Sequence, residues 1–279
     1  MSRGKVAGTV PDPAHEVSGL NHTLSGDPRD PAVLFLHGFM GRAGDWRDLS
    51  AGLDKRFLCI AVDLPGHGAS LEMPPDRYTM EGAARSVLDA LDKAGVDRMT
   101  VVGYSMGGRL ALYLALRHPD RCAGLFLESA SPGLEDDGER TARRRADEQK
   151  AIRLESGDFR EFLNDWYRQP LFAPLARDEG LLRQTIENKL GEDPAELAMS
   201  LRGMGTGSQP SLWRELPGLR VPSLAVAGEL DEKFVGISRR VASLCPPMRV
   251  AVVPGAGHNV HAEAPGGYLS SLRGFLDGR

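Results

Sequence analysis

The chain has 279 residues, enough for one large α/β core, with or without an inserted subdomain, that buries most of its apolar surface. Hydrophobic residues make up 41% of the chain and charged residues 26%, so the composition favours neither a disordered nor a membrane protein. The formal net charge of -4 provides no basic footprint for nucleic acid, and any anion site must therefore be a local cluster of cations.

The sequence contains no segment that predicts secretion or membrane insertion. The first residues, MSRGKVAGTVPDPAHEV, lack the apolar run of a secretion signal, and no stretch approaches the roughly 18 apolar residues of a transmembrane helix. The three cysteines, Cys59, Cys122 and Cys245, are widely spread and lack metal-ligand spacing, so we interpret them as small core residues. We expect a cytoplasmic protein without a membrane partner, and no sequence feature specifies an oligomeric state.

Apolar runs that alternate with helical patterns predict a mostly parallel, doubly wound α/β sheet. Continuous apolar runs are typical of parallel strands that are buried on both faces, and the intervening helices give the βαβ order of such a fold. A short antiparallel hairpin, formed by HEVSG and LNHTLSG, is expected before the first parallel strand. We predict strands at 32–38, 57–64, 99–105, 124–130, 223–229 and 249–255, and helices at about 79–93, 106–118, 235–244 and 264–277.

One long interval interrupts this alternation. From Ser131 to about Leu216 no convincing strand occurs, and amphipathic segments such as ERTARRRADEQKAIRL and DFREFLNDWY follow one another. An insertion of this size after a core strand predicts a helical cap over the carboxyl edge of the sheet, where open α/β folds bind ligands. The predicted division is a core of residues 1–130 and 217–279 with a cap of residues 131–216.

The segment Gly103–Gly107 reads Gly-Tyr-Ser-Met-Gly and lies between a predicted strand and a predicted helix. Glycines two positions on either side of a serine permit the tight, strained turn that exposes a nucleophilic hydroxyl, an arrangement typical of the α/β-hydrolase fold. The motif therefore identifies Ser105 as the candidate nucleophile or base.

A serine hydroxyl needs an adjacent imidazole to take its proton, and in this fold the order along the chain is serine, acid, histidine. His258, in GAGHNVHAEAP after the last predicted strand, is the favoured histidine, and His261 is its nearby alternative. His67 precedes the serine and is interpreted as a residue that orders a loop.

The third member of the triad must orient the imidazole and stabilise its charged form. Asp231, in AGELDEKF, follows the penultimate predicted strand, as that role requires. Glu128 and Glu229 remain competing carboxylates, because the acid can follow a different strand. The oxyanion hole is predicted from the backbone N–H groups of Met106, directly after the serine, and Phe39, in the loop LHGFMG after the first parallel strand.

Several motifs across the predicted core and cap resemble one family of the α/β-hydrolase superfamily, 2-succinyl-6-hydroxy-2,4-cyclohexadiene-1-carboxylate synthase, a lyase of menaquinone biosynthesis. GYSMGGR, DWYRQP and LRGMGTG resemble this family in particular, whereas the other core motifs occur in many esterases and carbon–carbon hydrolases. The resemblance implies a substrate with three carboxylates: a succinyl arm, a ring carboxylate and an enolpyruvyl ether that leaves as pyruvate. The motifs are LHGFMGRAGDW, DLPGHGAS, GYSMGGR, SPGLEDDGERTARRRADE, DWYRQPLF, SLRGMGTGSQPSLW, GELDEKF and AGHNVHAEAP.

The position and the charge of Arg109 favour an anionic substrate. It lies four residues after Ser105, one helical turn along the same face, and its guanidinium offers a bidentate fork for a carboxylate. A salt bridge beneath the site is the alternative role. Of the cap run Arg143–Arg145, at least two members are interpreted as a solvated helix face, and Arg143 matches the family's carboxylate-binding arginine by its spacing from SPGL.

Three further residues are candidate substrate contacts. The resemblance implies Trp166 in DWYRQP, for which packing inside the cap is the alternative. Tyr104, directly before the serine, is placed to hydrogen-bond near the oxyanion, and Lys233 in DEKF adds positive potential unless it is a surface lysine.

The sequence departs from the family at a third carboxylate contact. By spacing from Leu190 and Gly191, Ile186 falls where the family has a cap arginine, so Arg183 or Arg202 is expected to substitute for it.

The sequence therefore predicts a lyase in which Ser105, with its proton held by His258, acts as a general base, and no metal or cofactor is expected. The first alternative is a carboxylester or carbon–carbon hydrolase that uses the same triad for covalent catalysis. The second is a non-catalytic ligand receptor on a hydrolase fold, which the intact Ser105, Asp231 and His258 set disfavours.

Overall fold

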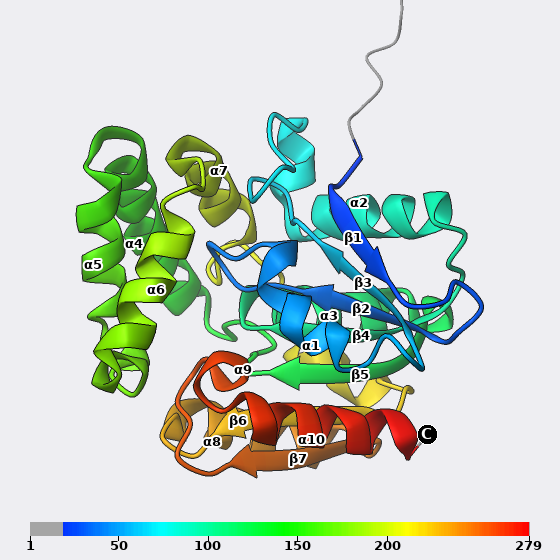
Figure 1. Ribbon diagram of the computed structural model, residues 1–279. Coiled ribbons are helices and arrows are strands. Elements are labelled where there is room, and N and C mark those ends of the chain that lie inside the picture. Colours follow the sequence, from blue (N-terminus) through cyan, green and yellow to red (C-terminus); the bar gives the residue numbers. More distant parts are fainter. Residues whose placement is uncertain (1–18, 279) are drawn as a thin grey trace, which may run out of the picture.

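The computed structural model describes residues 19–278, and its centre is a seven-stranded sheet (Figure 1). The strands follow the order β1-β3-β2-β4-β5-β6-β7, and all neighbouring strands are parallel except β1 and β3. The six predicted parallel strands are thereby confirmed. The strands are β1 (His22–Ser25), β2 (Ala32–Leu36), β3 (Leu58–Val62), β4 (Met99–Tyr104), β5 (Cys122–Glu128), β6 (Ser223–Gly228) and β7 (Met248–Val253).

The predicted amino-terminal hairpin differs from the structure. Its first arm, HEVSG, falls almost entirely outside the described residues, and its second arm contains β1, which pairs antiparallel with β3 through Ser25 and Cys59 at one end and His22 and Val62 at the other. β1 therefore joins the edge of the main sheet.

The four helices predicted in the core are present, and one begins earlier than the apolar pattern indicates. α8 starts at Glu232, because the carboxylate of Asp231 caps it by accepting a hydrogen bond from the Phe234 N–H at 3.3 Å. The helices are α1 (Arg47–Ala51), α2 (Met80–Lys93), α3 (Met106–Arg117), α4 (Asp137–Ser156), α5 (Phe159–Tyr167), α6 (Glu179–Lys189), α7 (Pro194–Met204), α8 (Glu232–Leu244), α9 (Val260–Glu263) and α10 (Pro265–Asp277).

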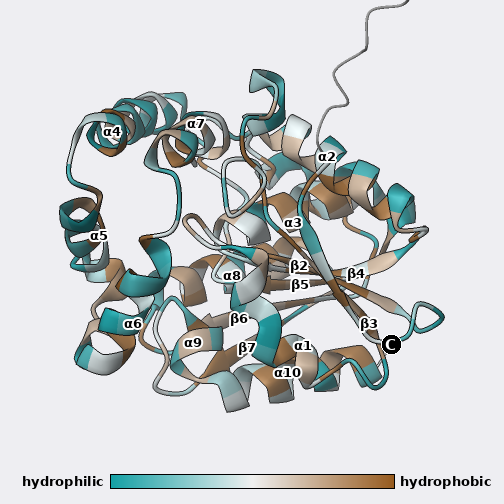
Figure 2. Ribbon diagram, turned by 45° about the horizontal axis from the view of Figure 1, so that its top comes forward, coloured by the Kyte–Doolittle hydropathy of each residue, from teal (hydrophilic) through white to brown (hydrophobic). Residues whose placement is uncertain are grey.

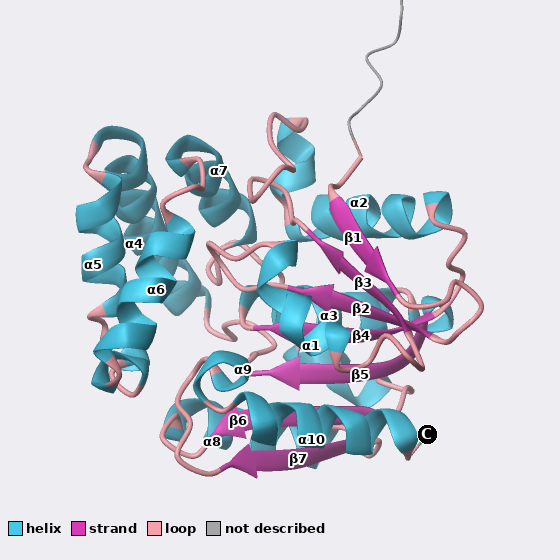
Figure 3. Cartoon of the chain, in the orientation of Figure 1, coloured by secondary structure: helices cyan, strands magenta, loops and turns pink. Residues whose placement is uncertain are grey.

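Helices cover both faces of the sheet, and the alternation of side chains along β2 shows why. Leu34 and Leu36 are buried in a cluster that contains residues of α2 and α3, whereas Val33 and Phe35 are buried in a second cluster with residues of α1 and α10. Figure 3 shows these helices on opposite sides of the strands, and Figure 2 shows the strands as a hydrophobic layer between them.

α4 to α7 follow β5 in the chain and precede β6, in the interval where the sequence predicts no strand. They lie beyond the ends towards which the parallel strands point (Figure 1). Their buried side chains form a third apolar cluster, and Met40 from the loop after β2 joins it. The cluster includes Leu154, Phe162, Leu163, Tyr167, Phe172, Leu197 and Leu201.

The three cysteines Cys59, Cys122 and Cys245 are buried thiols. Within residues 19–278, no helix combines the length and the apolar character that crossing a bilayer requires.

Candidate active site

Ser105 lies in a strained turn between β4 and α3. Its backbone has φ 49° and ψ -105°, a conformation that side-chain-bearing residues rarely adopt. The glycines around it permit the turn, because a Cβ on Gly107 would lie 2.2 Å from the Leu36 carbonyl oxygen and one on Gly103 would lie 2.4 Å from the Gly107 carbonyl oxygen. The motif therefore folds as the predicted elbow.

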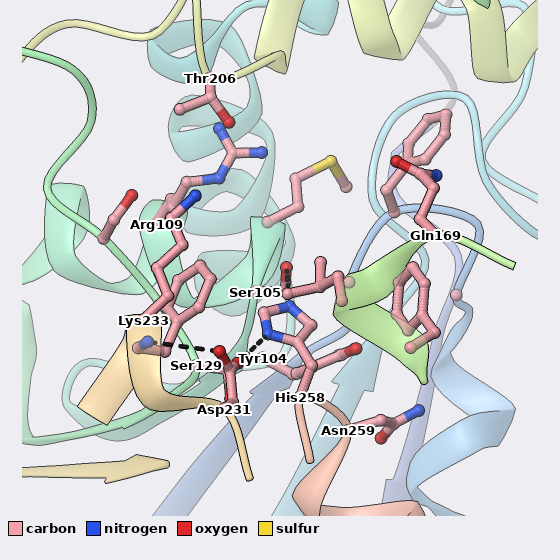
Figure 4. Close-up of a pocket in the computed structure, with 18 of the residues that line it drawn as sticks. Tyr104, Ser105, Arg109, Ser129, Gln169, Thr206, Asp231, Lys233, His258 and Asn259 are labelled. Carbon is pink, nitrogen blue, oxygen red and sulfur yellow. Dashed lines mark hydrogen bonds and ion pairs between the residues drawn. The ribbon is translucent and has the colours of Figure 1, made fainter. Parts of the chain in front are cut away.

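The structure brings the three predicted triad residues together in hydrogen-bond contact (Figure 4). His258 Nε2 lies 3.2 Å from Ser105 Oγ, and His258 Nδ1 lies 2.7 Å from Asp231 Oδ2. Because an ionised carboxylate only accepts, Nδ1 carries the proton that it donates to Asp231, which leaves Nε2 to accept from the serine hydroxyl. His258 and Asp231 are 2% and 7% exposed, so this chain of hydrogen bonds is shielded from solvent.

His261, the alternative histidine, is paired with Glu128, one of the two alternative carboxylates. His261 donates its backbone N–H to Glu128 Oε1 at 3.0 Å and its Nδ1–H to Glu128 Oε2 at 2.7 Å. Glu229 is exposed and accepts a hydrogen bond from the Gly255 N–H at 3.0 Å. Neither carboxylate contacts the imidazole of His258, which is paired with Asp231.

His67 lies in the loop after β3, as predicted, and its ring is fully buried. His67 Nδ1 lies 3.1 Å from the Pro65 carbonyl oxygen, and its ring packs against that of His37 at a centroid distance of 4.9 Å, with the ring planes tilted by 54°. Burial lowers the pKa of both imidazoles, so they are neutral in the folded protein. His37 uses its Nε2 to accept a hydrogen bond from the Leu64 N–H at 2.9 Å, which fixes the loop.

The two predicted oxyanion donors flank the serine. Met106 is the first residue of α3, so its N–H has no acceptor within the helix and is available to a ligand. Phe39 lies in the loop after β2, and both residues line the same cavity as Ser105 and His258. The helix amino terminus adds a partial positive charge at this point.

The triad opens into a cavity of about 710 Å³ between the carboxyl edge of the sheet and the helices α4 to α7. Basic side chains outnumber acidic ones in its lining. Among the described residues, three acidic side chains line it, namely Asp45, Asp231 and Glu232, against five basic ones, which are Arg109, Arg143, Lys150, Lys189 and Lys233. The excess of positive charge suits an anionic ligand.

Arg109 is a partly buried cation on α3. Its Nη1 donates to the Met204 carbonyl oxygen at 2.7 Å and to Oε1 of Gln209, and within residues 19–278 it forms no ion pair. Burial lowers the pKa of Arg109 to about 9; the charge of Arg143 also lowers this pKa, and that of Asp147 raises it. The guanidinium is therefore still protonated at neutral pH. Figure 4 shows Arg109 on the same side of Ser105 as Lys233, with Gln169 on the opposite side.

Arg143 is the member of the run Arg143–Arg145 that lines the cavity. Its Nε donates to both carboxylate oxygens of Asp147, at 2.8 and 3.0 Å. Arg144 and Arg145 lie on the exposed side of α4, as the sequence indicates for two of the three.

The three other predicted contacts also line the cavity. Trp166 packs on Phe39 at a centroid distance of 5.3 Å, so it belongs both to the packing of the inserted helices and to the cavity wall. Burial and the charge of Glu128 raise the pKa of Tyr104 well above its ordinary value, so its phenol is a neutral donor. Lys233 is exposed at the cavity edge.

The predicted replacements for the third arginine lie elsewhere. Arg183 is exposed, and Arg202 binds Glu148 at 2.9 Å and also binds Glu155; neither is among the described residues that line the cavity. Ile186 is buried in the apolar cluster of the inserted helices.

Two basic residues of the lining, Lys150 and Lys189, are absent from the sequence prediction. Lys150 follows Arg143 by seven residues, which is two helical turns on one face, and Lys189 follows Ile186 by three. Lys189 donates to Asp45 Oδ2 at 2.6 Å and so links α6 to the loop after β2. The helical spacing from Arg143 is the signal that could have identified Lys150.

A metal centre is not apparent, since residues 19–278 contain no group of three or more His, Cys, Asp or Glu side chains arranged to hold an ion.

Comparison with known proteins agrees with the fold and identifies the family. A family model described as the alpha/beta hydrolase fold matches residues 31–265. The 2-succinyl-6-hydroxy-2,4-cyclohexadiene-1-carboxylate synthase of Salmonella paratyphi C (strain RKS4594) is 33% identical over 257 residues, which cover 91% of this chain and 96% of that protein. A Bacillus subtilis (strain 168) protein given the same name provisionally is 38% identical over 236 residues, covering 84% and 86%.

Solved structures give the same result. The structure of MenH from S. aureus matches with a TM-score of 0.87 at 31% identity and covers 93% of this chain and 98% of that one. The enol-lactonase from Burkholderia xenovorans LB400 matches with a TM-score of 0.80 at 21% identity, covering 92% and 96%, and shares the fold. The chain therefore belongs to the α/β-hydrolase fold family and, within it, to the 2-succinyl-6-hydroxy-2,4-cyclohexadiene-1-carboxylate synthases.

Proposed function

We propose that this protein is a carbon–oxygen lyase that eliminates pyruvate from 2-succinyl-5-enolpyruvyl-6-hydroxy-3-cyclohexene-1-carboxylate, to give 2-succinyl-6-hydroxy-2,4-cyclohexadiene-1-carboxylate in menaquinone biosynthesis. Family membership supports this reaction. The observation that carries the proposal in the structure is Arg109, a partly buried guanidinium one helical turn after Ser105 in a cation-rich cavity, whose hydrogen bonds within residues 19–278 go to neutral acceptors.

The reaction begins with proton abstraction. Ser105 Oγ transfers its proton to His258 Nε2, 3.2 Å away, and takes a proton from the ring carbon beside the succinyl carbonyl. Asp231 stabilises the resulting imidazolium through Nδ1, with which it is already in contact at 2.7 Å. No acyl-enzyme is formed, because serine acts as a base.

The electrons of the broken C–H bond move onto the carbonyl oxygen, and the N–H groups of Phe39 and Met106 stabilise the dienolate. Donors that are already oriented towards developing charge lower the barrier without reorganising. When the dienolate collapses, the C–O bond to the enolpyruvyl group breaks, the enol oxygen takes the proton held by His258, and the enol becomes pyruvate.

Residues that line the cavity bind the carboxylates of the substrate. In this proposal Arg109 and Arg143 hold two of the three, Lys233 adds positive potential at the cavity edge, Tyr104 donates near the oxyanion, and Trp166 packs on the ring. We also propose that residues 131–216 act as a cap domain on a core formed by residues 1–130 and 217–279. A cap excludes water and so strengthens each electrostatic contact inside.

The test is a coupled assay of pyruvate release with wild type, Ser105→Ala and Arg109→Ala. We expect Ser105→Ala to lower kcat by about 10³-fold or more, because the base is lost, and Arg109→Ala to raise KM strongly, because a carboxylate loses its partner. Arg145→Ala, which removes an exposed arginine of α4, is the control and is expected to behave as wild type. Wild-type protein that hydrolyses activated esters with a burst but releases no pyruvate would overturn the proposal in favour of a hydrolase.

A further inference from the structure

We propose that Lys150 on α4 is a substrate-binding residue that, with Arg143, forms a second carboxylate subsite in the cavity, in addition to the one at Arg109. The inference rests on the proposed function, because it adds a second cation to the subsite that the proposed function assigns to Arg143.

The geometry of α4 places the two cations on one face. Arg143, Asp147 and Lys150 follow one another at spacings of four and three residues, so they lie in one row along the helix. Arg143 and Lys150 line the cavity, while Asp147, 3% exposed, lies between them. The row therefore presents two cations to the cavity with a single acid beneath them.

The charges in this row do not balance. Arg143 Nε donates to both oxygens of Asp147, at 2.8 and 3.0 Å, whereas Lys150 Nζ is 3.8 Å from Oδ1, beyond hydrogen-bond distance. One carboxylate thus faces two cations, and Arg109, which has no acidic partner of its own among the described residues, adds a third in the same cavity. The excess positive charge of this wall matches a second anionic group of the ligand.

A bound anion would also stabilise the charged form of Lys150. Its side chain is 30% exposed, and partial burial lowers the pKa of its ammonium despite the charge of Asp147. A carboxylate in the cavity would replace the water that the ammonium has lost with a charge-assisted hydrogen bond, which is among the stronger polar contacts in proteins.

The other basic residues near the cavity have different surroundings. Lys189 is bound to Asp45 at 2.6 Å, and Arg202 is held by the two carboxylates of Glu148 and Glu155. Lys233 is exposed on α8, in the core. Of the inserted helices' cavity-lining cations within residues 19–278, Lys150 has the longest ion pair, 3.8 Å to Asp147, compared with 2.8 Å for Arg143 and 2.6 Å for Lys189.

The experiment compares pyruvate release by wild type, Lys150→Met, Lys150→Arg and Arg145→Met. Lys150→Met removes the charge and keeps the length of the side chain, and Arg145→Met removes the same charge from the exposed side of the same helix. We expect Lys150→Met to raise KM about tenfold or more with kcat changed less than threefold, which is the signature of lost substrate binding. Lys150→Arg should restore most of the affinity, and Arg145→Met should match wild type.

A Lys150→Met variant with the KM of Arg145→Met would overturn the inference and leave the proposed function intact. So would a loss of kcat with unchanged KM that Lys150→Arg does not restore. Wild type that releases no pyruvate would count against the proposed function instead. In that case calorimetric binding of the aromatic dicarboxylate 2-succinylbenzoate to wild type, Lys150→Met and Arg145→Met decides the role of Lys150 without turnover, since equal affinity for the three proteins would overturn it.

Discussion

His261 Nδ1 lies 2.7 Å from Glu128 Oε2, the same separation as that between His258 Nδ1 and Asp231 Oδ2. Two imidazole–carboxylate pairs thus lie side by side at the carboxyl edge of the sheet, three residues apart in the chain. The two pairs differ in the contacts that the imidazole makes beyond its carboxylate. His258 Nε2 is hydrogen-bonded to Ser105, whereas the His261 ring packs on Trp46 at a centroid distance of 4.6 Å. In the proposed mechanism the first pair transfers the proton, whereas the second holds the loop.

This difference predicts separate effects for two alanine variants in one loop. His258→Ala should lower kcat for pyruvate release by about 10³-fold, because the serine loses its proton acceptor. His261→Ala should lower kcat less than tenfold and reduce the melting temperature, because it breaks the side-chain contact with buried Glu128. Steady-state kinetics and thermal unfolding of both variants check this. If His261→Ala were inactive and His258→Ala active, then His261 would be the proton acceptor and His258 the residue that holds the loop.

The elbow predicts a strong asymmetry between two glycine substitutions in helices. Gly107→Ala would place its Cβ 2.2 Å from the Leu36 carbonyl oxygen, so the backbone of β2 or α3 has to move. We expect it to destabilise the fold by about 2 kcal/mol or more, the range of overpacked core substitutions. Gly236→Ala on α8 meets no atom within 4 Å and should stabilise by up to about 1 kcal/mol through helix propensity.

Urea unfolding of both alanine variants measures these changes. Equal stabilities for the two would show that the elbow tolerates a Cβ and that its glycines have no steric role.

Buried His67 predicts a loss of stability in mild acid. Its pKa is lowered by burial, so below the ordinary value of 6.5 the unfolded chain binds a proton that the folded protein does not. Stability is therefore complete above about pH 6.5 and falls as the pH decreases below it, by at most about 1.4 kcal/mol per pH unit for this group. His67→Gln removes the titration and should make the dependence of unfolding free energy on pH between 6.5 and 5 shallower.

His22→Gln, which changes an exposed histidine, is the matched control and should keep the wild-type slope. A His67→Gln protein with the wild-type slope in urea unfolding across this range would contradict the neutral, buried state of the ring.

The sequence alone is sufficient for the sheet and the triad because local patterns encode both. Each parallel strand is an apolar run, and the order of Ser105, Asp231 and His258 along the chain matches the order of strand ends at the carboxyl edge. The choice between His258 and His261, in contrast, depends on the path of a loop that leaves one ring facing the serine and the other facing Glu128.

Lys150 shows where such patterns stop being informative. α4 has twenty residues but only three buried ones, Asp147, Ala151 and Leu154, so its sequence carries little periodicity that would identify the side facing the core. Which lysine or arginine of such a polar helix enters a cavity is determined by the packing of α4 on α7, a relationship between segments far apart in the chain. The same holds for Arg202, whose two glutamate partners lie on α4.

The proximity of Arg109 to Arg143 has a consequence for the lifetime of the protein as well as for catalysis. Burial is the main cause of the lowered pKa of Arg109, the charge of Arg143 lowers it further, and Asp147 only partly compensates for this repulsion. A bound polycarboxylate relieves this repulsion in the folded state and has no comparable site on the unfolded chain, so occupancy raises the free energy of unfolding. The folded population then depends on the supply of substrate, and the enzyme is most resistant to unfolding and proteolysis in cells that are making its ligand.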